Sequence, residues 1–180
     1  VGQGTCTMKY SPKVNDRLAA HPSLLDLHPL QDQADAQGVL EIMWRTQRML
    51  AELSGMAEVG LHTQGGSAAI WTNIAMIRAY FEHRGEAGQR TEVITTIFSH
   101  PSNAATAKAA GYDVITIYPD ADGYPDIEAL KRALSPRTAA IMVTNPEDTG
   151  IYNPRIAEWV DLAHGVGALA SYDQANANGI

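Results

Sequence analysis

The chain has 180 residues, 45% apolar and 18% charged, which is ordinary for a folded globular protein with one core. Thirteen basic and twenty acidic residues give a net charge of -7, which argues against nucleic acid or an anionic membrane as the main partner. The single cysteine, Cys6, excludes an internal disulfide and a cysteine metal cluster, and favours a reduced thiol in a cytoplasmic protein. No apolar run approaches a membrane span, and no two histidines have the spacing of helical metal ligands.

The first part of the chain has little periodicity and three prolines, so we expect an extended N-terminal arm with short turns over residues 1–37. Helical spacing of apolar residues then predicts one helix over 39–53 and another over 70–81. Gly55 is suited to end the first helix in the left-handed conformation. Because the chain has no initiator methionine, we expect it to be part of a longer protein.

From Glu92 onward, short β-branched segments alternate with helical ones. Strands are predicted over 92–98, 113–118 and 138–144, followed by a short buried strand that ends at Asp173. Polar caps mark the helices between them: Ser102 or Asn103, Asp126, and Asn153 followed by Pro154. Residues 38–180 are therefore predicted to form an α/β three-layer sandwich around a mainly parallel sheet.

In a parallel sheet, the residues that follow each strand share one edge, where ligands bind. The residues predicted there are Ser99 and His100, then Thr144, Asn145 and Pro146, and finally Asp173. A carboxylate in this place can pair with a cationic ring nitrogen, as in pyridoxal phosphate enzymes. Each residue alone is typical of an ordinary turn or helix cap, so the prediction rests on their joint placement.

A glycine pair, Gly65-Gly66, precedes the second predicted helix. Small residues at a helix start leave the first backbone N–H groups exposed, and such a terminus suits a phosphate. The same pattern also occurs in turns that bind nothing. A nucleotide-binding domain is disfavoured, because no Gly-x-Gly-x-x-Gly follows a strand and no Walker lysine is present.

Taken together, these segments resemble glycine dehydrogenase (decarboxylating), the P-protein of the glycine cleavage system, in its second subunit or C-terminal half. The matching segments are 4–13, 76–80 with 83–86, 99–100 with 103–104, 144–146 with 150, and 172–173 with 175–176. The most specific of them is Gly-Thr-Cys-Thr-Met-Lys-Tyr-Ser-Pro-Lys at 4–13.

The resemblance implies an oxidoreductase with the large domain of fold-type I pyridoxal phosphate enzymes, incomplete in this chain. It implies that His100 stacks on the cofactor ring as the catalytic histidine, and that Asp173 pairs with the ring nitrogen. Asn145 would approach the ring hydroxyl. Backbone N–H groups would hold the phosphate at Gly66, Ser67 and Ala68.

The implied reaction decarboxylates glycine and passes the aminomethyl group to a lipoylated carrier protein, with a homologous subunit 1 as partner. The family's cofactor-binding lysine would lie beyond Ile180, so we expect this fragment to be inactive. The chain also departs from the family at 64–70, at Pro101-Ser102 and at Gln174. These departures keep open a second hypothesis, a degenerate non-catalytic homologue that serves as a binding or assembly subunit.

Overall fold

The computed structural model describes residues 11–175 and 177. Cys6, most of the 4–13 motif and Asn176 lie outside the described residues. Within the described part, the chain divides into two compact units, with the boundary between His62 and Thr63. None of the helices there is both long and apolar enough to cross a membrane.

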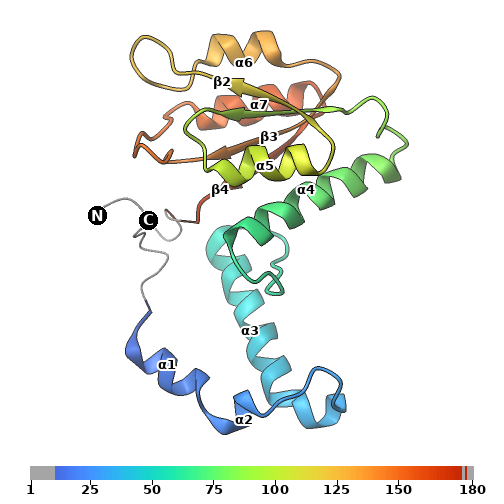
Figure 1. Ribbon diagram of the computed structural model, residues 1–180, viewed down its shortest axis with the longest axis vertical. Helices are drawn as coiled ribbons and strands as arrows, with labels where there is room; N and C mark the ends of the chain where they lie inside the picture. The colour runs from blue at the N-terminus through green and yellow to red at the C-terminus, as the bar shows by residue number, and fades with distance from the viewer. Residues whose placement is uncertain (1–10, 176, 178–180) are drawn as a thin grey trace. The chain divides into compact units, whose positions relative to one another are not determined.

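The first unit is helical (Figure 1). Its elements are α1 (Lys13–Ala19), α2 (Pro22–Leu25), the 3-10 helix η2 (Gln33–Ala36) and α3 (Gln37–Ser54). The described part of the expected arm thus contains short helices. The side chain of His21 accepts a hydrogen bond from the N–H of Ser23 at the start of α2, and that of Asp32 accepts one from the N–H of Ala34 at the start of η2. As predicted, α3 ends where Gly55 turns into the left-handed region with a φ of 70°. The assignment of 1–37 and 38–180 as separate regions stays a prediction.

The second unit is an α/β sandwich with three layers (Figure 1). Its strands are β1 (Glu92–Thr96), β2 (Asp113–Ile117), β3 (Thr138–Thr144) and β4 (Leu169–Asp173). They lie in the order β2-β1-β3-β4 and pair in parallel throughout. The helices are α4 (Gly66–His83), α5 (Pro101–Ala109), α6 (Ile127–Ala133) and α7 (Ile156–Gly165). This architecture confirms the predicted fold class.

The core has two halves, one on each face of the sheet. On one face, Ile74 and Phe81 of α4 pack with Met142 and other strand residues. On the other face, Leu130 of α6 and Trp159 of α7 are fully buried. Burial of each such side chain contributes about 1.5–3 kcal/mol. Since β3 has a strand on either side and helices on both faces, six of its seven residues are buried.

Arg90 joins the amino ends of the strands on the far side from the predicted site. Its Nη1 atom donates to the carbonyl oxygens of Thr138 and Val166, each at 2.9 Å. Its guanidinium lies 5.3 Å from the centre of the Phe81 ring. Gly167 passes close by with a φ of 76°, where an added Cβ would lie 2.6 Å from Arg90 Nη2. The close approach and the left-handed backbone both require glycine there.

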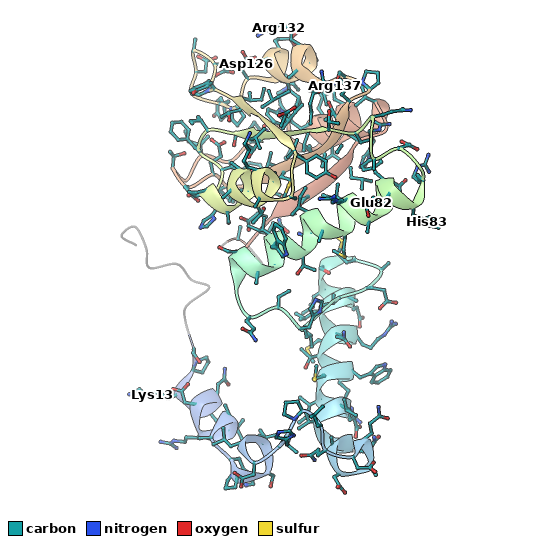
Figure 2. All side chains as sticks on the ribbon, turned by 45° about the vertical axis from the view of Figure 1, so that its right-hand side comes forward. Lys13, Glu82, His83, Asp126, Arg132 and Arg137 are labelled. Carbon is teal, nitrogen blue, oxygen red and sulfur yellow. The ribbon has the colours of Figure 1, made fainter. Side chains whose placement is uncertain are left out.

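Helix α6 begins as predicted. The Asp126 carboxylate accepts hydrogen bonds from the N–H groups of Glu128 at 2.8 Å and Ala129 at 3.0 Å. Arg132, six residues later, places its guanidinium 3.7 Å from the same carboxylate (Figure 2). An N-cap of this kind typically stabilises a helix by about 1 kcal/mol.

Two other predicted helix starts are wrong. The cap of α5 is His100, not Ser102 or Asn103, because its Nδ1 accepts the N–H of Ser102 at 3.2 Å and Pro101 takes the first turn. Helix α7 begins at Ile156. The Asn153 side chain instead accepts the N–H of Arg155 at 2.9 Å, forming a turn ahead of the helix.

Strand β1, which precedes His100, and strand β4, which ends at Asp173, also differ from prediction. Strand β1 ends at Thr96, because the chain turns after it: Ser99 N donates to Thr96 O at 3.2 Å. Strand β4 was predicted to be buried, and this is wrong, since only Ser171 of its five residues is buried. Among the described strands β4 lies at an edge of the sheet, which exposes its alternate residues.

Candidate functional site

The predicted residues meet where parallel strands β1, β3 and β4 end. The Thr144 hydroxyl, at the end of β3, donates to Asp173 Oδ2 at the end of β4, over 3.0 Å. The hydroxyl oxygen of Thr144 also accepts a hydrogen bond from the backbone N–H of His100, at 2.9 Å. Asp173 Oδ1 accepts the N–H of Ala175 at 3.0 Å. His100, Thr144 and Asp173 are therefore one hydrogen-bonded group at the carboxyl edge, as parallel topology predicts.

Two polar residues, Ser99 and Asn103, bond to Thr144 and hold it in place. The sequence pattern alone did not predict this role for them. Ser99 Oγ accepts the N–H of Thr144 at 2.8 Å and the Nδ2 of Asn103 at 3.0 Å. Asn103 Nδ2 also reaches Thr144 Oγ1 at 3.1 Å. Ser99 and Asn103 are 6% and 1% exposed. Buried polar side chains that bond to one another in this way fix the positions of the segments that carry them.

The imidazole of His100 is fixed from one side. Its Nδ1 accepts the Ser102 N–H and lies 2.5 Å from the Ser102 hydroxyl. The residue itself is exposed. A ring that is held by one nitrogen and open to solvent is suited to stacking on a planar ligand.

The start of α4 lies beside the same edge. Asn73 Nδ2 donates to Ser171 Oγ at 3.3 Å. Phe81, nearer the other end of α4, lies against Arg90, which directly precedes β1 in the chain, so α4 runs antiparallel to the strands. Asp173 lies two residues beyond Ser171, about 6.6 Å along the strand. Ala68 lies five residues before Asn73, about 7.5 Å along the helix axis in the same direction. The first turn of α4 and Asp173 are thus at the same height in the fold.

This first turn offers donors and space. The first bond of the helix ladder runs from Ala69 N to Gly65 O at 2.9 Å, so the N–H groups of Gly66, Ser67 and Ala68 precede it. These three residues are exposed. A Cβ at Gly65 or Gly66 would meet nothing within 4 Å. The turn therefore has the features of an anion site.

Asn145 is only 2% exposed, and one of the two polar atoms of its side chain has a hydrogen-bond partner. Its Oδ1 accepts the N–H of Asn153 at 2.8 Å, and its backbone N–H donates to the Asp173 carbonyl at 3.2 Å. Its Nδ2 has no partner among the described residues. A cis peptide bond joins it to Pro146. A buried, unused amide donor next to Asp173 fits a ligand with an acceptor oxygen.

Glu147 is a buried carboxyl close to this site that sequence reasoning missed. It is 5% exposed and has no ion pair within the described residues. Burial raises the pKa of Glu147, and the charge of Asp148 adds to the rise, whereas the Thr96 hydroxyl opposes it. Nothing in the sequence indicates that Glu147 is buried, because the acidic pair Glu147-Asp148 in a turn would normally face solvent.

A parallel α/β sheet with a helix start, an exposed imidazole and a hydrogen-bonded carboxylate at its carboxyl edge is the large-domain architecture of pyridoxal phosphate enzymes of fold-type I. The chain belongs to the class-V aminotransferase family, whose family model matches residues 32–179. That family is pyridoxal phosphate-dependent.

Curated relatives give a closer comparison. The chain is 42% identical over 177 residues to "Probable glycine dehydrogenase (decarboxylating) subunit 2" of Pyrococcus horikoshii, and equally so to the protein of that name from Lysinibacillus sphaericus. These matches cover 98% of this chain but 35% and 36% of the relatives. The chain therefore spans about a third of their length, and the predicted resemblance is confirmed over almost all of it.

Solved structures agree on the fold. Sphingosine-1-phosphate lyase from Burkholderia pseudomallei matches with a TM-score of 0.56 at 21% identity, over 62% of this chain and 26% of that one. A double mutant of aspartate aminotransferase from Thermus thermophilus matches with a TM-score of 0.50 at 25% identity, over 62% of this chain and 28% of the other.

Proposed function

We propose that this chain forms part of a pyridoxal phosphate-dependent glycine decarboxylase of the P-protein subunit 2 type. The observation that supports the proposal most strongly is the Thr144–Asp173 hydrogen bond. It fixes a carboxylate on the carboxyl edge, beside His100 and level with the first turn of α4. The curated relatives carry the name of this enzyme subunit.

The residues present fit the cofactor. The N–H groups of Gly66, Ser67 and Ala68 would hold its phosphate, and His100 would stack on its ring. Asp173 would pair with the ring nitrogen, and the unused Nδ2 of Asn145 would donate to the ring hydroxyl. When bound, the protonated ring supplies the electron sink for the carbanion that glycine becomes on losing carbon dioxide. The carboxylate of Asp173 would keep the ring nitrogen protonated during this step.

The covalent anchor is proposed to lie outside these 180 residues. Three lysines fall within the described part of the chain: Lys13 in α1, Lys108 near the end of α5 and Lys131 near the end of α6. The two in the α/β unit, Lys108 and Lys131, lie near the ends of helices that start after strands, away from the carboxyl edge. We therefore propose that the chain by itself does not turn over glycine.

The partners are proposed on the same basis. The relatives are named as subunit 2, which supports a homologous subunit 1 as partner. Glycine would be the substrate and a lipoylated protein would accept the aminomethyl group. We place the protein in the cytoplasm, with no nucleic acid or membrane partner, on its acidic charge and its single cysteine.

A non-catalytic binding or assembly subunit is the second candidate. Pro101 at the start of α5 favours it, because proline removes a backbone N–H donor directly after the ring-stacking histidine. The two candidates differ in what the full-length parent protein does with the cofactor.

The deciding experiment is an absorbance titration of the full-length parent protein with pyridoxal phosphate. The enzyme reading predicts a band near ~420 nm that borohydride bleaches, which reports a covalent bond to a lysine. The same titration with an Asp173→Ala parent should give a weaker band at equal protein concentration. A parent that has the lysine but shows no such band would refute the enzyme and leave the non-catalytic subunit.

A further inference from the structure

The hydroxyl of Thr144 has one proton, and its surroundings determine where that proton points. Two N–H groups, from His100 at 2.9 Å and Asn103 Nδ2 at 3.1 Å, donate to its oxygen and have no acceptor capacity of their own. Within the described residues, the hydroxyl has an acceptor in the carboxylate of Asp173, whose Oδ2 lies 3.0 Å away. The proton of Thr144 is therefore committed to Asp173 Oδ2.

Ser99 keeps this arrangement in place. Its oxygen accepts the N–H of Thr144 at 2.8 Å and of Asn103 at 3.0 Å, so the end of β3 and the start of α5 are held to the same atom. The hydroxyl of Ser99 lies 3.2 Å from that of Thr144. With Asn103 and Ser99 both buried, Thr144 has little freedom to turn its hydroxyl elsewhere.

We propose that Thr144 is a positioning residue that sets the rotation of the Asp173 carboxylate for a pyridinium nitrogen. This inference rests on the proposed function and assigns a role that the cofactor contacts alone do not. Thr144 donates to one oxygen and Ala175 to the other, so the plane of the carboxylate is fixed before any ligand arrives. A carboxylate that is already oriented loses less rotational freedom on binding, and this raises its affinity for the ligand.

A neighbouring threonine provides the control. Thr95, on β1, is 2% exposed and also carries a hydroxyl close to the carboxyl edge. Its hydroxyl has no hydrogen-bond partner among the described residues and does not bond to Asp173. A buried threonine at this edge is therefore not by itself a positioning residue.

The first test needs no cofactor. Thr144→Val, Asp173→Ala and the double variant of the 180-residue chain are unfolded with urea and monitored by circular dichroism. Because the two side chains bond directly, the double variant should lose less stability than the two single variants together. Additive losses would overturn the inference.

The second test measures equilibrium binding of pyridoxal phosphate to the same chain, followed by quenching of tryptophan fluorescence. Thr144→Val should bind roughly tenfold more weakly, since a hydrogen bond to a charged group is lost. Thr144→Ser should restore the affinity, and Thr95→Val should match the wild type. Folded Thr144→Val that binds as tightly as the wild type would overturn the inference. If the wild-type chain itself binds no pyridoxal phosphate, the role of Thr144 toward that cofactor fails, whereas the proposed function is decided separately by the titration of the full-length parent.

Discussion

Replacement of Arg90 by methionine should cost a large part of the stability of the α/β unit. The change keeps an apolar stem but removes both donors to the carbonyls of Thr138 and Val166, which then lose their partner. Each bond from a charged donor contributes about 1.5–3 kcal/mol, and the contact with the Phe81 ring adds about 0.5–1 kcal/mol. Because these contributions share one side chain and overlap, we expect a loss of about 3–5 kcal/mol.

The assay is urea unfolding at 25 °C, followed by circular dichroism, with the free energy of unfolding extrapolated to water. The matched control is Arg132→Met, an arginine whose side chain is 71% exposed and 3.7 Å from Asp126. Its effect should stay within about 0.5 kcal/mol. An Arg90→Met variant no less stable than the control would refute the claim that Arg90 stabilises the fold through its bonds to Thr138 and Val166 at the amino ends of the strands.

Two further predictions concern stability. Gly167→Ala should lower the free energy of unfolding by about 2 kcal/mol, because alanine is strained at a φ of 76° and its Cβ would displace Arg90. The control is Gly165→Ala, whose Cβ would meet nothing within 4 Å and which should not lower that free energy. Equal losses for the two variants in urea unfolding would contradict the clash with Arg90. Glu147→Gln should raise the melting temperature at pH 7, because burial raises the pKa of Glu147 and its ionisation disfavours the folded state. Since stability is then lost as the pH rises from the unfolded value of 4.5 through the folded pKa, the gain should vanish below about pH 4. The exposed Glu128→Gln serves as control, since Lys131 holds the pKa of Glu128 below its usual range; a gain for Glu147→Gln that does not change with pH would contradict the burial argument.

The fold was predictable where a single residue or short pattern determines the local structure. β3 was predicted at the observed bounds, because its seven residues form an apolar and β-branched run that is buried on both faces. Gly55 and Asp126 were predicted as helix ends because left-handed backbone and a free carboxylate have few alternatives there. The placement of His100 near Asp173 followed from parallel topology alone.

The remaining features depend on neighbours that the sequence does not reveal. The side chains of β4 are exposed because, among the described strands, β4 lies at an edge of the sheet, and the residues of β4 alone do not reveal that position. The support of Thr144 by Ser99 and Asn103 requires the register of β1 against β3 and the start of α5, a contact across more than forty positions. Glu147 is buried because the turn that carries it folds back against the loop after β1, where Asp148 N donates to Phe98 O at 2.9 Å.

The central claim is that the carboxyl edge of the sheet binds pyridoxal phosphate through Asp173 and the start of α4. The most direct measurement is a crystal structure of this chain with N-phosphopyridoxyl-glycine, a stable reduced adduct that needs no lysine. The account predicts the phosphate at the N–H groups of Gly66, Ser67 and Ala68, and the ring nitrogen within hydrogen-bond distance of Asp173. An adduct bound elsewhere, or turned so that its ring nitrogen faces away from Asp173, would contradict it.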